Sequence, residues 1–172
     1  MLSILKIKKL FFLGVFISCL VAFFDLLTKE IIFNFIENGV LEGGLEFESE
    51  VRVFSFFSLV RVWNYGVSFG MFNSLKHSQV IFSAIQGFIA LGLLFWLFQN
   101  EKKHYTYALG LIIGGALGNM IDRIQNGAVA DFLDFHIATY HWPAFNLADS
   151  CVFIGVAILL LDDFLTFHPQ KK

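Results

Sequence analysis

Four long apolar blocks, separated by polar stretches, dominate the chain. They are Leu10–Phe24, Gln79–Phe98, Tyr105–Ile121 and Phe145–Leu161. Each approaches the ~20 residues that an α-helix needs to cross the hydrocarbon core of a bilayer, once flanking residues are counted. A soluble core could not absorb four such blocks in a chain of 172 residues. The pattern therefore predicts a mainly α, polytopic membrane protein with four transmembrane helices.

We expect one membrane domain that covers residues 1–172. The predicted spans, with their flanks, are about 10–32, 79–98, 105–123 and 145–163. The outer loop at 33–78 contains Val51–Phe56, which alternates in part between apolar and polar residues, and the β-prone run Leu59–Trp63. Such runs are typical of strands. We predict two or three short strands that form a small outer sheet at the membrane surface.

Composition supports the membrane assignment and argues against a nucleic-acid partner. The chain is 57% hydrophobic and 15% charged, whereas a soluble domain averages roughly 45–50% apolar and 25% charged residues. The formal net charge is only −2, and no basic stripe occurs in the sequence. An electrostatic surface for nucleic acid is therefore not expected.

The charges of the short polar segments predict the orientation. Lysines gather at the N-terminus, between the second and third blocks and at the C-terminus, at positions 6, 8, 9, 102, 103, 171 and 172. Cytoplasmic loops carry an excess of Lys and Arg. Four crossings then place both termini in the cytoplasm, and the glutamate-rich loop 33–78 and the loop 122–143 outside.

Two acidic residues, Asp131 and Asp149, lie near the predicted outer ends of apolar segments. Carboxylates at membrane depth are costly and usually functional. Asn146 and Asp149 also fit a helix N-cap and its third residue, but no cap explains Asp131. If the two carboxyl groups approach to a few ångströms, one keeps its proton while the other acts as a base, and together they can activate a water. The sequence does not establish that closeness.

Further polar residues repeat a helical spacing of three and four. Asp25 and Lys29 share one helix face with Thr28, and the pair is either a structural ion pair or a support for an outer site. Asn119, Asp122 and Arg123 repeat the pattern. Arg123 either forms a salt bridge at the end of its helix or binds a carboxylate or a lipid phosphate through two hydrogen bonds.

Small residues recur at four-residue spacing in the first and third segments. Such ridges let helices approach closely in lipid and predict a compact bundle. The ridges consist of Gly14, Ser18 and Ala22, and of Gly110, Gly114 and Gly118.

Other catalytic schemes are weakly supported. Ser68 lies in no G-x-S-x-G motif, although Lys29 would be a formal partner for a serine nucleophile. His136 and His141 follow Asp131 and Asp134, but no H-E-x-x-H motif occurs, and histidines in an outer loop are usually solvated. We expect neither a metal nor an organic cofactor.

The polar motifs, taken in order, resemble the lipoprotein signal peptidases (signal peptidase II). The resemblance runs from Asp25 to Asp149 and departs at Leu26, where members often carry Gln. It rests on five motifs: Asp25-x-x-Thr28-Lys29, Asn64-x-Gly66-x-Ser68-Phe69-Gly70, Gly118-Asn119-x-x-Asp122-Arg123, Val129-x-Asp131-Phe132 and Phe145-Asn146-x-Ala148-Asp149.

The resemblance implies a membrane aspartyl endopeptidase of the bacterial cytoplasmic (inner) membrane, with a β-rich extracytoplasmic cradle and its active site on the outer face. Its substrate would be a diacylglyceryl-modified prolipoprotein, cut on the amino side of the lipidated cysteine. Membrane lipids and a globomycin-type inhibitor would be further partners. The implied catalytic pair is Asp131 and Asp149. The implied positioning residues are Asn64, Asn119, Arg123 and Asn146, and the implied supporting contacts are Asp25, Lys29 and Asp122.

Two rival functions remain open from the residues alone. Intramembrane aspartates also serve as proton relays, but a relay needs carboxylates spread through the membrane depth. Here they gather at the predicted outer ends, with only Asp162 and Asp163 at the inner end. A non-catalytic assembly factor that binds partner helices through its glycine ridges would leave the pair of aspartates unexplained.

Overall fold

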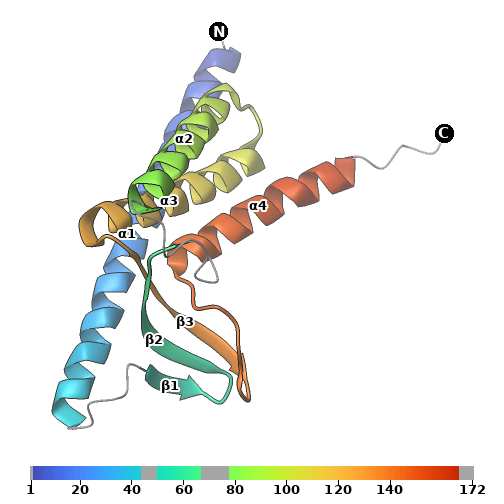
Figure 1. The fold of residues 1–172 in the computed structure, drawn as a ribbon. Coiled ribbons are helices and arrows are strands. Elements are labelled where there is room, and N and C mark those ends of the chain that lie inside the picture. The colour runs from blue at the N-terminus through green and yellow to red at the C-terminus, as the bar shows by residue number, and fades with distance from the viewer. Residues whose placement is uncertain (1, 44–49, 67–77, 167–172) are drawn as a thin grey trace.

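The protein is mainly helical, with a small antiparallel sheet at one end of a helix bundle (Figure 1). The computed structural model describes residues 2–43, 50–66 and 78–166. The helices are α1 (Leu2–Gly43), α2 (Ser78–Gln99), α3 (Lys103–Asn126) and α4 (Leu147–Thr166). The strands are β1 (Glu50–Phe54), β2 (Phe57–Asn64), β3 (Val129–Ile137) and β4 (Tyr140–His141).

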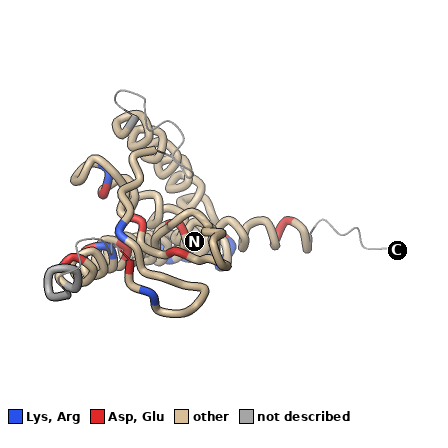
Figure 2. Tube along the Cα trace, turned by 60° about the horizontal axis from the view of Figure 1, so that its bottom comes forward, with Lys and Arg blue, Asp and Glu red and all other residues tan. Residues whose placement is uncertain are grey.

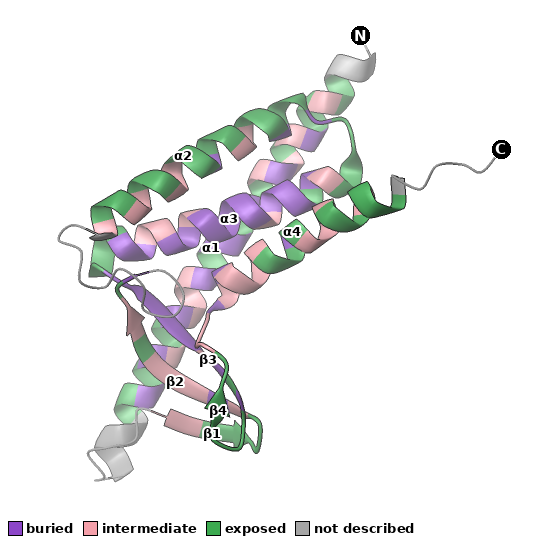
Figure 3. Cartoon of the chain, turned by 45° about the vertical axis from the view of Figure 1, so that its right-hand side comes forward, coloured by how far each residue is buried: buried purple, intermediate pink, exposed green. Residues whose placement is uncertain are grey.

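Helix α3 is the centre of the bundle and packs against α1, α2 and α4. In Figure 3 its ribbon is largely buried, whereas much of α2 is exposed. The predicted glycine ridge is confirmed as a close helix contact. A Cβ on Gly114 would lie 2.7 Å from the carbonyl oxygen of Ser18, and the Ser18 hydroxyl donates to the carbonyl of Gly110 at 3.1 Å. Only small residues at these positions let the backbones of α1 and α3 approach this closely.

Two described helices are long and apolar enough to cross a membrane by length and composition. They are Leu5–Asn38 within α1, near the N-terminus, and Gln79–Gln99 within α2. Many large apolar side chains on the helices are exposed, among them Phe12, Phe88 and Phe153. Charged residues form a small part of the trace in Figure 2. Of the described helices, α3 and α4 do not meet the same criterion of length and composition, so the four-span arrangement stays a prediction.

The sheet has the strand order β1-β2-β3-β4, and all neighbouring strands are antiparallel. Strands β1 and β2 lie where the sequence predicts them. The outer loop begins later than predicted, because residues 33–43 continue helix α1. The reason is burial: Phe33 packs against Ala130 and Phe132 of β3, with Trp63 of β2 at the edge of this cluster.

The expectation that residues 122–143 form a loop is wrong. Helix α3 continues to Asn126 and ends at Gly127, whose φ of 70° lies in the left-handed region that glycine favours. Strand β3 then begins at Val129 and pairs with β2 on one side and with β4 on the other. These long-range pairings decide the structure of the segment, and they place Asp131 on a strand.

Candidate active site

Asp131 lies on β3 at the end of the sheet that meets the helices, and it is only 2% exposed. Asn64, at the end of the neighbouring strand β2, donates from Nδ2 to Asp131 Oδ2 at 3.0 Å. Asn146 donates from Nδ2 to Asp131 Oδ1 at 2.7 Å. Each carboxyl oxygen therefore has one amide donor, which fixes the orientation of the group.

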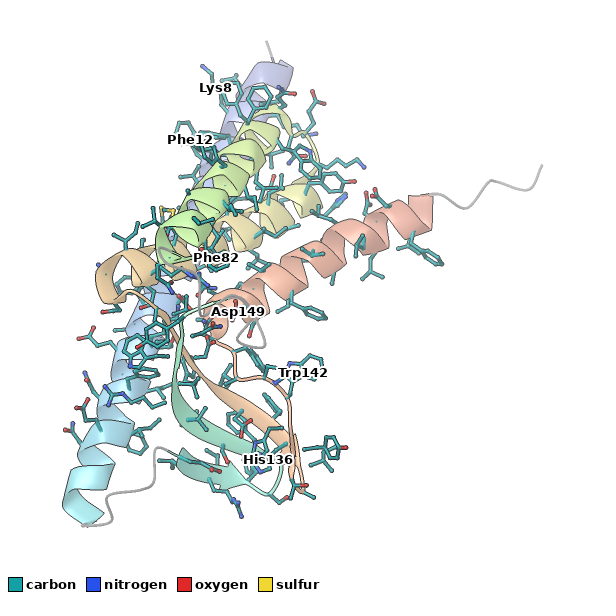
Figure 4. All side chains as sticks on the ribbon, in the orientation of Figure 1. Lys8, Phe12, Phe82, His136, Trp142 and Asp149 are labelled. Atoms are coloured by element: carbon teal, nitrogen blue, oxygen red, sulfur yellow. The ribbon has the colours of Figure 1, made fainter. Side chains whose placement is uncertain are left out.

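Asp149 lies in the first turn of α4, where Figure 4 shows it near the junction between the bundle and the sheet. The carbonyl oxygen of the Asn146 side chain accepts the Asp149 N–H at 3.0 Å, and the Asn146 N–H donates to Asp149 Oδ2 at 3.4 Å. This reciprocal pair is a capping box, so the helix-capping interpretation is confirmed. Asn119 of α3 adds a bond from Nδ2 to Asp149 Oδ1 at 2.8 Å, which capping does not require.

The two aspartates share Asn146, which is completely buried. Its side-chain amide donates to Asp131 while its side-chain carbonyl and backbone N–H bind Asp149. Residues far apart in the sequence are thereby brought to one site. Burial, and after it the negative charge of Asp149, raise the pKa of Asp131 to a net value of about 7. The hydrogen bonds from Asn64 and Asn146 oppose that increase, because they favour the ionised carboxylate.

A buried lysine joins the remaining acidic residues behind this pair. Lys29 Nζ lies 2.7 Å from Asp25 Oδ2 and 3.2 Å from Asp122 Oδ2, and it donates to Asn119 Oδ1 at 2.9 Å. Lys29, Asp25 and Asp122 are each less than 5% exposed. The predicted ion pair between Asp25 and Lys29 is confirmed, and Asp122 joins it from α3.

The carboxylates of Asp25 and Asp122 also bind the backbone next to Asp149 and Asp131, respectively. Asp25 Oδ1 accepts the N–H of Ala148, which precedes Asp149, at 2.8 Å. Asp122 Oδ2 accepts the N–H of Ala130, which precedes Asp131, at 2.8 Å. The cluster around Lys29 therefore fixes both segments that carry the aspartate pair.

Comparison with known proteins identifies the family. The family described as signal peptidase (SPase) II matches residues 17–165 of this chain. The chain belongs to the signal peptidase II family. This is a family of peptidases, and the recognised motifs all fall within the matched residues.

Relatives support the assignment to the signal peptidase II family. A lipoprotein signal peptidase of Anaplasma marginale is 47% identical over 113 residues, which cover 63% of this chain and 64% of the relative. The match thus spans under two thirds of that protein. A lipoprotein signal peptidase of Paraburkholderia phytofirmans is 39% identical over 149 residues, which cover 86% of this chain and 81% of the relative.

A solved structure shares the fold of this signal peptidase II family member. It is described as a bacterial membrane enzyme determined by the in meso method at 2.3 Å resolution. The TM-score is 0.73 at 27% sequence identity, and the alignment covers 92% of each chain. Family membership, this neighbour and the two apolar helices together indicate a membrane location.

The sequence of this signal peptidase II family member left two roles open for Arg123, and one was a salt bridge at the end of its helix. Among the described residues, the structure shows no such salt bridge with Asp122. The Arg123 guanidinium donates instead to Gln86 Oε1 at 3.0 Å and to the carbonyl of Gly66 at 3.1 Å. The ion pair of Asp122 is with Lys29. Arg123 therefore ties α2 and the end of the sheet to α3, beside the aspartate pair.

Gln86 is a site neighbour that the sequence analysis missed. Its signal was a long polar side chain in the interior of the second apolar block. Ser68 lies outside the described residues, so its position carries no argument. Lys29 is occupied by two carboxylates and one amide oxygen, an arrangement that favours a structural role over general-base chemistry with a serine.

A second group of titratable residues lies farther along the sheet. Asp134, His136 and His141 each offer one possible metal-ligand atom, and these atoms all lie within 4.8 Å of one another. Figure 4 shows His136 well away from Asp149. Within the described residues, this group forms no hydrogen bond or ion pair with Asp131 or Asp149, and its own polar contacts join its members to one another.

Proposed function

We propose that this protein is a membrane aspartyl endopeptidase that removes the signal peptide from diacylglyceryl-modified prolipoproteins, cutting on the amino side of the lipidated cysteine. Its family and the names of its relatives support cleavage of signal peptides from lipoproteins. The observation that carries the finer proposal is the shared partner Asn146, which binds Asp131 and Asp149 at once.

In the proposed mechanism, Asp131 and Asp149 act as one unit that holds a single proton. A pKa of about 7 for Asp131 makes its protonated and ionised forms comparably populated near neutral pH. The ionised carboxyl accepts a proton from a bound water, and that water attacks the scissile carbonyl carbon. The protonated carboxyl donates a hydrogen bond to the carbonyl oxygen. Collapse of the tetrahedral intermediate breaks the C–N bond, and a carboxyl proton passes to the departing amine of the lipidated cysteine.

Asn64, Asn119 and Asn146 are positioning residues in this scheme. Their side-chain amides donate three hydrogen bonds to the two carboxyl groups, and the backbone N–H of Asn146 donates a fourth. The cluster of Lys29 with Asp25 and Asp122 is a deeper support, because it holds the backbone beside each aspartate. Such preorganisation lowers the cost of reaching the reactive geometry.

A lipid-anchored substrate suits the apolar helix surface. Acyl chains can rest against exposed side chains such as Phe88 and Phe153 while the scissile bond reaches the polar junction between helices and sheet. Diffusion in the membrane plane then brings enzyme and substrate together. The proposal places the protein in the bacterial inner membrane with four crossings, both termini in the cytoplasm and the sheet outside. The clustered N-terminal lysines support this orientation.

The proton-relay alternative gains no support from the arrangement of carboxylates. Asp25, Asp122, Asp131 and Asp149 belong to one connected polar network. Asp162 pairs with Lys102 at the other end of α4, at 3.1 Å. Within the described residues, no acidic side chain of α4 lies between Asp149 and Asp162, whereas a relay needs a continuous series of proton carriers.

The test is cleavage by the purified full chain in detergent. The substrates are one prolipoprotein with diacylglycerol on its lipobox cysteine and the same precursor without the lipid. We expect cleavage of the lipidated form only, and inhibition by globomycin. Equal cleavage of both forms would remove the lipid-dependent part of the proposal. Absence of cleavage, with a native thermal unfolding transition, would contradict the proposed function itself.

A further inference from the structure

The group formed by Asp134, His136 and His141 lies on the sheet, apart from the aspartate pair. Asp131 and Asp134 are three positions apart on β3, and successive side chains of a strand point to opposite faces. Asp134 and His136 therefore share a face that Asp131 does not. Asp131 and His136 are five positions apart, which corresponds to ~16 Å along an extended strand.

Strand pairing brings His141 to the same place. His141 of β4 is the direct antiparallel partner of His136. The N–H of Trp142 donates to the carbonyl of Phe135 at 2.8 Å, which makes the histidine pair a non-hydrogen-bonded one. Side chains approach most closely in such pairs. The two imidazole rings are stacked, with centroids 4.9 Å apart and planes at 26°.

The carboxylate lies between the ring nitrogens. Asp134 Oδ2 is 2.8 Å from His141 Nδ1 and 3.4 Å from His136 Nδ1. In a tetrahedral zinc site with bonds of about 2.0–2.2 Å, neighbouring ligand atoms are ~3.3 Å apart. The observed spacings, all within 4.8 Å, need only small side-chain rotations to reach that value.

His136 supplies an independent reason to expect a ligand. His136 is only 6% exposed, and its buried Nδ1 forms no hydrogen bond among the described residues, since the carboxylate of Asp134, 3.4 Å away, makes only a charge contact that requires a protonated ring. A buried polar atom that forms no hydrogen bond destabilises the folded state. A metal ion bound by this nitrogen would remove that destabilisation.

We propose that Asp134, His136 and His141 bind one divalent first-row transition-metal ion, of the class represented by Zn²⁺. Two imidazoles and one carboxylate suit such an ion. His141 is exposed, so water can fill the fourth position. The bound ion would join β4 to β3 through these three side chains, and it would stabilise the hairpin whose chain continues into Asn146 and α4. Its role is structural and separate from peptide hydrolysis.

The test is zinc binding by the full-length protein, purified in detergent with a tag that contains no histidine and then stripped of metal with EDTA. Zinc is titrated in competition with a chromophoric chelator. We expect one ion per chain. His141→Ala and Asp134→Asn should each weaken binding at least ~tenfold. His141 is the preferred site for the variant because its exposed side chain can be truncated without opening the core.

The matched control is His104→Ala, which removes another exposed histidine that also lies beside a carboxylate, Asp162. This variant should bind zinc as the unmodified protein does. A second readout is thermal unfolding: zinc should raise the midpoint of the unmodified protein and of the control, but not of His141→Ala. Equal zinc affinity in the unmodified protein and in His141→Ala, or loss of binding in His104→Ala alone, would overturn the proposal.

Discussion

The buried carboxyl of Asp131 should make folding stability depend on pH in an unusual direction. Its pKa rises from 3.8 to about 7 in the folded protein, chiefly because burial disfavours the charge. Between these two values the folded state binds more protons than the unfolded state. The free energy of unfolding therefore falls as pH rises through this window. Most paired carboxylates have the opposite effect.

The size of the effect follows from the two pKa values. Integration of proton binding from pH 5 to pH 8 gives a loss of about 2–3 kcal/mol from this one group. The value is an upper bound, because residual structure in the unfolded state reduces the difference. For a protein of this size it corresponds to a fall in melting temperature of roughly 5–10 °C.

Asp131→Asn removes the titrating group while it keeps the shape of the side chain. We expect the stability of the variant to fall less steeply with pH than that of the unmodified protein, whatever its absolute stability. The measurement is thermal unfolding of the full chain in one detergent at several pH values between 5 and 8. The quantity compared is the slope of melting temperature against pH, so a constant offset from altered hydrogen bonds cancels.

Asp163→Asn is the matched control, because it makes the same chemical change at an exposed position at the other end of α4. It should retain the slope of the unmodified protein. Identical slopes for all three proteins would refute the reasoning, since Asp131 would then titrate at similar pH in the folded and unfolded states.

Three further changes test the supporting structure. Lys29→Ala should lower the free energy of unfolding by about 3–5 kcal/mol, because the change leaves two buried carboxylates without their cation. Urea or thermal unfolding measures this loss, and a loss below ~1 kcal/mol would contradict the prediction. Gly115→Ala should destabilise the protein by roughly 1–3 kcal/mol, since a Cβ there would lie 2.5 Å from a backbone oxygen at the start of α4; Gly92→Ala, with open space around it, is the control. Asn64→Ala removes a bond that favours ionised Asp131, so the acidic limb of the kcat/KM profile should move to higher pH, and an unchanged profile would argue against that contact.

The helices were predictable because each apolar block carries its own signal. The ridge of glycines on the third block also indicated its close partner, and Gly114 does lie against Ser18. Where α1 ends was not predictable. Residues 33–43 are polar enough to suggest a loop, yet Phe33 is buried by the sheet, whose strands lie elsewhere in the sequence.

The site was predictable in its residue types but not in its connections. Spacing alone paired Asp25 with Lys29, because i and i+4 share one helix face. Spacing could not show that Asp122 joins Lys29 rather than Arg123, since that choice depends on how α1 and α3 cross. Strand β3 was missed for the same reason: its pairing with β2 and β4 involves long-range contacts.

The histidine group illustrates a further limit of sequence analysis. His136 and His141 were expected to be solvated loop residues, and no metal was expected. The structure buries His136 and stacks the two rings across paired strands. The turn between them, with Ala138 at a φ of 53°, is short enough to bring the strands together, but no motif in the sequence marks it.

The most direct test of the central claim is cleavage of a diacylglyceryl-modified precursor by Asp131→Asn and Asp149→Asn. Each purified variant is compared with the unmodified protein and with Asp163→Asn, after thermal unfolding has shown that all are folded. We predict that both site variants lose detectable cleavage while Asp163→Asn retains it. Normal turnover by a folded Asp131→Asn or Asp149→Asn protein would contradict the account, because peptide hydrolysis would then not depend on this pair of carboxyl groups.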